Sequence, residues 1–287
     1  MIKTLSVFLV LLSLSTVTAP RILADETPKV TALDSETTLQ TILASSDRSE
    51  VNRARDPYRH PLQTLDFLGL DPKMTVVELW PGNGWYTEIL APFLAQQGQL
   101  IVTNLDPQKS KPAQLFREKL AANPKVFGQV KVVQIDPPND LILAPENSVD
   151  MVLTFRNIHN WVSAGYAERV YAAAYQALKP GGILGVEEHR AKPGTSWLES
   201  AKTGYMSEEE VIAAVEKAGF KLVGKSEINA NPKDTKDYPG GVWTLPPTLS
   251  QGEKDRQRYL AIGESDRMTL KFVKPKVPSP AQKLRQS

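Results

Sequence analysis

The chain has 287 residues, and its 34 Lys and Arg residues against 32 Asp and Glu residues give a formal net charge of +2. This balance excludes the strongly basic surface typical of nucleic-acid binding, so we predict no nucleic-acid partner. The hydrophobic content of 41% is typical of a globular protein, and the absence of cysteine excludes disulfides, thiol nucleophiles and thiolate metal sites.

The N-terminus has the pattern of a secretory signal peptide. Lys3 supplies a positive charge, and the apolar stretch after it, residues 5–14, is shorter than the roughly 18–20 residues of a membrane-spanning helix. Small residues before Asp25 make Ala24 the predicted last residue of a cleaved signal peptide, 1–24. We therefore expect a periplasmic or secreted protein whose mature chain has no membrane span, with an uncleaved anchor as the alternative.

Residues 25–70 are predicted to form a polar tail and a helical extension. Apolar residues at helical spacing indicate helices near Thr38–Ala44 and Leu62–Leu68, and Gly69 marks the end of the second. Between these helices, Arg53–Pro61 is dense in charge and proline.

A regular alternation of strands and helices follows the extension. The strands are short and rich in Val, Ile and Leu, as in a parallel sheet covered on both faces. The predicted strands are Thr75–Leu79, Gln99–Asn104, Val130–Ile135, Met151–Phe155, Ile183–Glu187, Lys221–Ile228 and Met268–Val273. The predicted helices are Trp85–Leu94, Ala113–Ala122, Ala164–Ala177 and Ser207–Ala218. This alternation predicts an α/β fold with a doubly wound sheet.

A long connection, residues 229–267, separates the last two predicted strands. Loops longer than roughly 12–15 residues are uncommon in compact domains and are often functional. This segment is not of low complexity, so we expect an ordered loop within a domain of residues 71–275. The remaining tail, 276–287, is rich in Pro and Lys and is predicted to be disordered.

The segment Val76–Thr87 is the most informative part of the chain. An apolar strand ends at Glu78, the turn Pro81–Gly84 carries two glycines, and an amphipathic helix starts near Tyr86. Glycine lets the backbone approach a ligand closely, and the N-terminus of a helix offers free N–H groups. A strand, a tight turn and a helix in this order predict a pocket for a nucleotide-like ligand.

This segment resembles the cofactor loop of the class I S-adenosylmethionine-dependent methyltransferases, whose pattern is acidic-x-Gly-x-Gly-x-Gly, with Trp80 in the place of the first glycine. Later segments are similar to the family in the same order along the chain: Ser148–Thr154, Ala177–Leu184 and Tyr205–Phe220. The resemblance runs from about Asp71 to Val273. It implies a Rossmann-like fold with a seven-stranded sheet of order 3-2-1-4-5-7-6, in which strand 7 is antiparallel.

The resemblance also implies S-adenosylmethionine as the cofactor. Asp106 is similar to the acidic residue that binds the ribose hydroxyls in the family, and Asp136 lies in a segment similar to the one that contacts adenine. Asn157 follows the fourth strand, where the family places polar groups near the methionine part. The implied cofactor-binding residues are Glu78, Pro81, Gly82, Gly84, Tyr86, Asp106, Asp136 and Asn157.

Two histidines follow strands of the predicted sheet. His159 comes just after the fourth strand and His189 ends the fifth, so both should lie at the edge where ligands bind. Imidazole can accept a proton near neutral pH, which makes His159 the predicted general base and His189 a second candidate. Arg190, beside His189, completes the predicted catalytic set. The alternative is that these histidines orient loops through hydrogen bonds.

Two other arrangements of polar residues are possible. Arginines near the same edge could bind an anionic substrate group or form salt bridges, namely Arg55, Arg59, Arg156 and Arg190. The three histidines of the chain could bind a metal together with Glu187, Glu188 or Asp56. They share no short local spacing, so we predict no metal.

The sequence therefore predicts an S-adenosylmethionine-dependent methyltransferase that acts on a small-molecule acceptor in the cell envelope. Three segments resemble a narrower group of exported bacterial methyltransferase-like proteins, namely Trp80–Thr87, Phe155–Trp161 and Gly263–Met268. An exported, non-catalytic ligand-binding protein on the same fold is the alternative, since Trp80 replaces a glycine and the cofactor is not expected to be plentiful outside the cytoplasm. A metal-assisted hydrolase is a third hypothesis.

Overall fold

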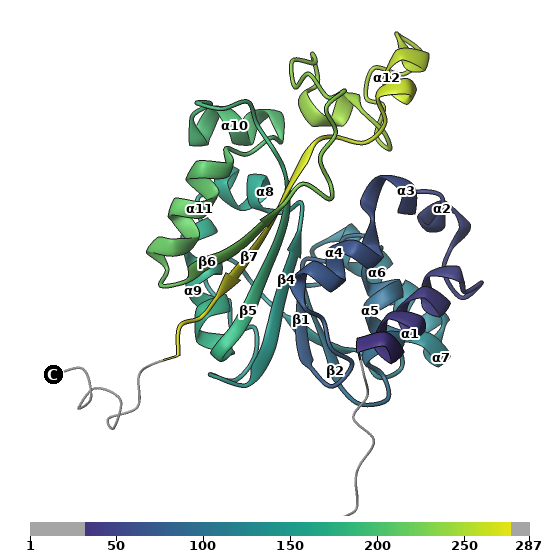
Figure 1. Cartoon of the computed structure of the whole chain (residues 1–287), viewed down its shortest axis with the longest axis vertical. Helices are drawn as coiled ribbons and strands as arrows, with labels where there is room; N and C mark the ends of the chain where they lie inside the picture. The colour runs from purple at the N-terminus through teal and green to yellow at the C-terminus, as the bar shows by residue number, and fades with distance from the viewer. Residues whose placement is uncertain (1–31, 277–287) are drawn as a thin grey trace, which may run out of the picture. The chain divides into compact units, whose positions relative to one another are not determined.

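A seven-stranded sheet forms the centre of the protein (Figure 1). The computed structural model describes residues 32–276, so the predicted signal peptide, its cleavage site and most of the predicted C-terminal tail lie outside the described residues. The strands are β1 (Thr75–Leu79), β2 (Gln99–Asn104), β3 (Lys131–Gln134), β4 (Val149–Phe155), β5 (Leu178–His189), β6 (Lys221–Ser226) and β7 (Arg267–Val273).

The strand order is β3-β2-β1-β4-β5-β7-β6. Strands β1 to β5 pair in parallel, and β7 runs antiparallel to both β5 and β6. The predicted fold class, a doubly wound α/β sheet with a reversed seventh strand, is confirmed.

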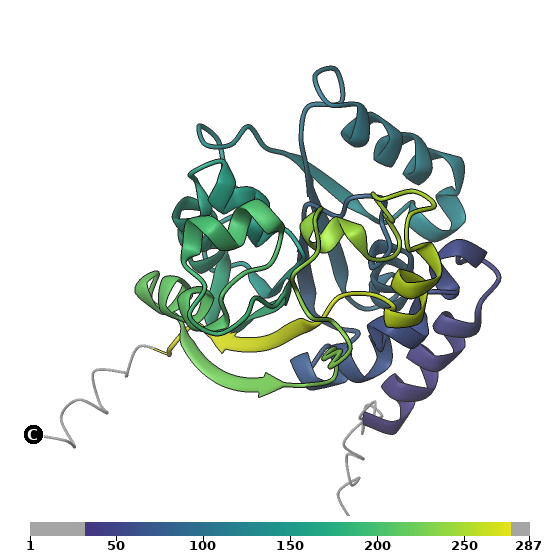
Figure 2. The same cartoon turned by 90° about the horizontal axis from the view of Figure 1, so that it is seen from above.

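Helices cover both faces of this sheet (Figures 1 and 2). On one face lie α8 (Ile158–Ser163), α9 (Ala167–Ala177), α10 (Trp197–Thr203) and α11 (Glu208–Lys217). On the other face lie α1 (Ala32–Ala44), α4 (Pro61–Leu68), α5 (Thr87–Leu94), α6 (Lys111–Ala122) and α7 (Pro124–Phe127). Successive residues of β1 explain the apolar composition of the strands: Val76 packs into one core cluster, Val77 into the other, and both are fully buried.

One helix of the structure was not predicted. The sequence predicts a helix over Ala164–Ala177, which the structure shows as α9 from Ala167, whereas the separate helix α8, which ends at Ser163, lies before the predicted start. Gly165 lies between them with φ +76°, a left-handed conformation that ends a helix and that glycine adopts without strain. This break allows α8 to follow β4 directly, and α8 carries His159.

Two additions to the sheet meet above its carboxyl edge. The N-terminal extension contributes the short helices α2 (Glu50–Arg53) and α3 (Asp56–Arg59). The long β6–β7 connection contains the 3-10 helix η1 (Gly241–Thr244) and α12 (Arg256–Ile262). In the described part of the chain, no helix is long and apolar enough to span a bilayer.

Candidate functional site

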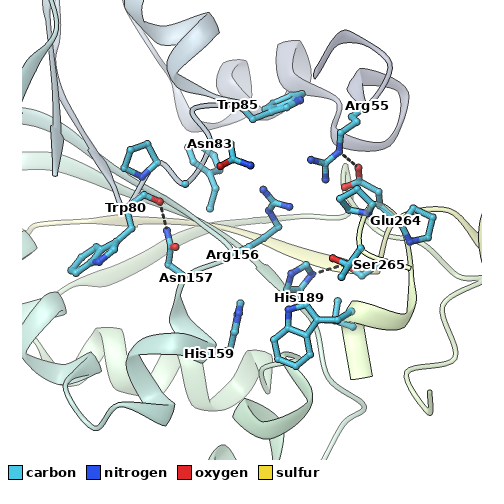
Figure 3. A pocket seen from close by; sticks show the side chains of 18 of the residues that line it. Arg55, Trp80, Asn83, Trp85, Arg156, Asn157, His159, His189, Glu264 and Ser265 are labelled. Atoms are coloured by element: carbon cyan, nitrogen blue, oxygen red, sulfur yellow. Dashed lines mark hydrogen bonds and ion pairs between the residues drawn. The ribbon is translucent and has the colours of Figure 1, made fainter. Parts of the chain in front are cut away.

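The ends of β1, β4 and β5 border a cavity of about 500 Å³ (Figure 3). Residues 51–55 of the extension and residues 242–248 and 264–265 of the β6–β7 connection complete its lining. This volume is typical of sites for small molecules, and open α/β sheets bind ligands at this edge. The cavity is therefore the candidate functional site.

The cavity has two chemically different ends. Residues 80–83 and Asn157 form the turn end, and Arg55, Arg156 and Glu264 form the arginine end. Figure 3 shows Asn157 on one side of the view and Arg55 and Glu264 on the other, with Arg156 between them.

Trp80, in the place of the first glycine of the family pattern, has a left-handed backbone conformation. Its φ of +43° lies in the left-handed region, which glycine adopts at little cost and other residues at about 1 kcal/mol or more. Its indole leaves the turn to pack beside Trp161, with ring centroids 5.1 Å apart, and beside Tyr166, at 6.5 Å. The side chain is therefore accommodated against α8 and the loop that follows it, while the backbone at Trp80 is left-handed.

The backbone at the turn end is open to a ligand. Gly82 has φ +58°, and no atom lies within 4 Å of the position that a Cβ would take. Within residues 32–276, no group accepts a hydrogen bond from the N–H of Gly82 or Asn83. Gly84 has another role, because its Cβ would lie 3.0 Å from the Phe116 ring, so this glycine serves packing. Of the predicted turn residues, Pro81 and Gly82 line the cavity.

Asn157 connects the ends of two neighbouring strands. Its Nδ2 donates to the carbonyl oxygen of Leu79 at the end of β1, at 3.0 Å, and lies 3.3 Å from Thr154 Oγ1 of β4. The amide therefore fixes the geometry of the turn end in addition to lining it.

Glu78 and Tyr86 support the turn from below. Glu78 is buried and accepts a hydrogen bond from Thr87 Oγ1 at 2.6 Å; burial raises its pKa to about 7, opposed by this bond and by Lys119. Tyr86 donates its hydroxyl to Glu187 at 2.8 Å. Neither side chain is part of the cavity lining.

The two aspartates implied by the family pattern lie outside the cavity. Asp106 accepts the N–H of Gln108 at 2.9 Å and closes the turn before α6, and Asp136 is exposed. The last residue of β2 is Asn104, whose side chain is bonded to the backbone of Ala113 and Leu105. The cavity therefore extends over the ends of β1, β4 and β5 and not over those of β2 and β3.

His159 and Glu188 form a buried pair beside the cavity. His159 Nδ1 lies 3.1 Å from Glu188 Oε1, so an ionised Glu188 places the proton on Nδ1 and leaves Nε2 as the basic nitrogen. Among the described residues, none forms a hydrogen bond with Nε2. Glu188 also accepts the N–H groups of Ile158, at 2.6 Å, and His189, at 2.9 Å, which hold its carboxylate in place.

His189 lies next to His159, with ring centroids 5.6 Å apart. Its Nδ1 is 2.6 Å from Ser265 Oγ (Figure 3). Burial, His159 and Arg156 together hold the pKa of His189 well below its usual range, so this imidazole is neutral at pH 7. The Trp243 ring, 5.9 Å from His159, closes this side of the cavity.

Arg190 and His60 lie apart from these histidines. The Arg190 guanidinium forms ion pairs with Asp266, at 2.9 Å, and with Glu227, at 2.6 Å, outside the cavity. His60 Nδ1 lies 3.4 Å from Asn229 Oδ1. The structure thus brings together two of the three predicted catalytic side chains.

His159, Glu188 and His189 each place one potential ligand atom within 4.8 Å of the others, close enough to hold a metal ion. Two observations oppose such an ion. The Glu188 oxygens already accept three hydrogen bonds, and the positive charges of Arg156 and Arg267 act on the His189 imidazole. The arrangement therefore favours proton transfer over metal binding.

A buried arginine cluster borders the other end of the cavity. It consists of Arg55, Arg59, Arg156 and Arg267 around the carboxylates Glu187 and Glu264. Glu264 accepts hydrogen bonds from three of the guanidinium groups, at 2.6 Å from Arg55, 3.2 Å from Arg59 and 2.9 Å from Arg267. The sequence indicates arginines at this edge but not their common partner, because residues 55 and 264 share no local pattern.

The sheet order, the reversed β7 and the glycine turn define the class I methyltransferase fold. Residues 77–186, from β1 to β5, match the family model described as a methyltransferase domain. No curated protein sequence matches the chain.

Solved structures agree on the fold. A SAM-dependent methyltransferase from Aquifex aeolicus is 18% identical with a TM-score of 0.51, and the match covers 68% of this chain and 93% of that one. The [4+2]-cyclase SpnF is 16% identical with a TM-score of 0.54, over 85% of this chain and 94% of that one. These identities show the fold alone, and a cyclase among the matches illustrates that the fold does not fix the reaction.

Proposed function

We propose that the protein is an S-adenosylmethionine-dependent methyltransferase with a small-molecule acceptor. One observation carries the proposal: an open glycine turn and a carboxylate-supported histidine face the same cavity. Both lie in or directly beside the segment that matches a methyltransferase domain. The turn is the part of the site suited to a cofactor, and the histidine is the part suited to proton transfer.

The turn end would hold the cofactor. The free N–H groups of Gly82 and Asn83 can donate to acceptor groups of a ligand, and the missing Cβ of Gly82 allows close approach. S-adenosylmethionine, when bound, supplies a methyl group on a positively charged sulfur. The chain provides no electrophile of its own; it positions the reactants and excludes water.

His159 would act as the general base. Its Nε2 takes the proton of the acceptor's X–H group, and the electron pair of that bond becomes available to form the new bond from X to the methyl carbon. The bound cofactor would supply the methyl carbon, and the electron pair of its carbon–sulfur bond would remain on sulfur as the leaving group. Glu188 keeps His159 in the correct tautomer and stabilises the imidazolium that results.

The location in the cell envelope is part of the same proposal and rests on the signal-peptide pattern of residues 1–24 and on the absence of cysteine.

A second candidate function, a non-catalytic ligand-binding protein, is favoured by one observation. The cavity does not reach Asp106 or Asp136, the acidic residues that the family pattern assigns to the ribose and adenine.

Calorimetric titration of the purified protein with S-adenosylhomocysteine tests the cofactor assignment. We expect saturable binding, and Gly82→Ala should weaken it about tenfold because the added methyl enters the cavity. Gly252→Ala is the matched control, since Gly252 has φ +62° and equally open surroundings away from the lining. Both variants place a side chain at a similar positive φ, so the backbone strain is similar. A difference in binding affinity between them therefore indicates a ligand at the turn.

The absence of binding at about 1 mM, a concentration at the upper end of common substrate affinities, would remove the cofactor assignment. Binding without methyl transfer to any acceptor would favour the second candidate.

A further inference from the structure

Arg156 forms no hydrogen bond or ion pair in the described chain, and only the more distant charges of Glu187 and Glu264 act on its guanidinium. It directly follows β4, lines the cavity and points toward the space between Asn83 and Arg55 (Figure 3). Across residues 32–276, no carboxylate or carbonyl group forms a hydrogen bond or ion pair with its guanidinium, and its Nε is buried. A guanidinium without a hydrogen-bond partner has an unfavourable free energy where water is scarce. We therefore expect a ligand that enters the cavity to pair with Arg156.

The surroundings of Arg156 have an excess of positive charge. The arginine cluster contains four guanidinium groups and two carboxylates. Three of the guanidinium groups bind Glu264, and the same Arg267 also lies 3.2 Å from Glu187 Oε1. Tyr86 occupies the other oxygen of Glu187. Glu264 is therefore fully engaged, and Glu187 Oε1 has an ion pair with Arg267 but no hydrogen bond. With four guanidinium groups against two carboxylates, the excess charge lies at the cavity on Arg156 and Arg55.

The neighbouring donors point to one kind of ligand. Arg55 has an Nη2 without a partner, and Arg59 has two such nitrogens, all buried. Arginine presents its donors in a planar fork that suits carboxylate and phosphate oxygens. Arg156 also adopts φ +60°, an uncommon conformation for a non-glycine residue and one that is concentrated at functional sites.

The arginine end is separate from the cofactor end. The turn end offers backbone N–H groups and the Asn157 amide, whereas Arg55 and Glu264 come from the extension and the β6–β7 connection. His159 and His189 border the space beside Arg156 (Figure 3). A group bound by Arg156 would therefore lie near the proposed base.

We propose that Arg156, assisted by Arg55, binds an oxyanion of the methyl acceptor, so that the acceptor is a small carboxylic acid or phosphate ester. The assignment of this anion to the acceptor rests on the proposed function; the anion site itself does not. Arg156 fixes the acceptor by its charged end and presents its X–H group to His159.

Calorimetry with inorganic phosphate and, separately, malonate at low ionic strength tests the anion site. Arg156→Gln should weaken binding of the preferred anion at least about tenfold, because the bidentate charged donor is lost. Arg156→Lys should fall between Gln and the natural residue, since it keeps the charge without the fork. Arg258→Gln is the matched control, because Arg258 is exposed and outside the cavity, and it should change affinity less than about twofold.

Thermal unfolding separates a ligand-binding arginine from a structural one. Without added anion, Arg156→Gln should unfold at the same temperature as the natural protein or higher, because a partly buried charge that forms no hydrogen bond or ion pair has been removed. Phosphate or malonate should raise the unfolding temperature of the natural protein and not that of the variant. A variant that unfolds earlier, or that binds both anions as well as the natural protein, would contradict the proposal.

A competition experiment identifies the source of the anion. If the anion belongs to the acceptor, protein saturated with S-adenosylhomocysteine still binds phosphate or malonate. Displacement of the anion by S-adenosylhomocysteine would assign the site to the cofactor's own carboxylate and overturn the proposal. If S-adenosylhomocysteine does not bind but Arg156→Gln still loses the anion, the proposed methyl transfer fails while the anion site stands.

Discussion

The two ends of the cavity are built in opposite ways. The turn end comes from one short stretch of sequence and Asn157, and it offers neutral backbone donors. The arginine end joins residues about 200 positions apart, Arg55 and Glu264, with Arg156 of the central sheet, and it offers buried charge. Local sequence can encode the first kind of site, whereas the second depends on the whole fold. We therefore expect the turn end to bind the proposed cofactor and the arginine end to bind the proposed acceptor.

Substitution of His159, which lies beside the cavity, should have the largest effect, and this effect is on the rate of methyl transfer. His159→Ala should lower the rate of methyl transfer by about 10²- to 10⁴-fold, the usual contribution of a general base, while leaving S-adenosylhomocysteine affinity unchanged. The measurement pairs single-turnover kinetics with calorimetry. His60→Asn is the control, because His60 lies outside the cavity and Asn tolerates its φ of +42°. Equal loss in both variants would remove His159 from its assigned role.

Substitution of Glu264, whose carboxylate binds three arginines of the arginine end, should have the next largest effect. This effect is on the stability of the fold. Burial alone would raise the pKa of Glu264, but Arg59 and Arg267 hold it at about 2. Glu264→Gln leaves the buried guanidinium groups of Arg59 and Arg267, and the partly exposed one of Arg55, without their shared anion. The free energy of unfolding at pH 7 should therefore fall by about 3–5 kcal/mol. Urea denaturation measures the change, and Glu253→Gln, which alters an exposed carboxylate, should cost less than about 0.5 kcal/mol.

The pH dependence of this effect has a definite sign. Because the pKa of Glu264 is lower in the folded protein than in the unfolded chain, its ionised form stabilises the fold. This stabilisation is complete above the unfolded value of about 4.5 and is lost as the pH falls toward about 2. Denaturation series over this range should show a smaller loss of stability for Glu264→Gln than for the natural protein. Parallel curves would show that Glu264 does not couple to the arginines in this way.

The smallest effect is expected at Asp106. Since its carboxylate closes a turn outside the cavity, Asp106→Asn should change S-adenosylhomocysteine affinity by less than about twofold. Asp71→Asn is a close control, because Asp71 accepts the N–H two residues ahead in the same manner. A tenfold loss at Asp106 alone would show that the ligand extends past the turn end to the end of β2, as the family pattern implies.

The sequence predicted the sheet because its strands are buried on both faces and read as continuous apolar runs, as Val76 and Val77 illustrate. The local pattern of strand ends and a glycine turn placed Pro81, Gly82 and Asn157 at the cavity. The rule that ligands bind at the carboxyl edge of such a sheet placed His159 and His189 there. Side-chain direction could not be predicted: His189 faces the cavity, while the adjacent Arg190 faces Asp266. The partners of Glu264 depend on tertiary packing that no local pattern records.

Trp80 also has a thermodynamic consequence. Glycine gives an unfolded or unliganded turn many conformations, and a ligand that orders such a turn loses part of its binding free energy. Trp80 has a left-handed backbone conformation while its indole packs beside Trp161 and Tyr166. The turn is therefore preorganised before any ligand arrives. Replacing the glycine of the motif transfers part of the entropic cost of binding from the encounter with the ligand to the folding of the chain.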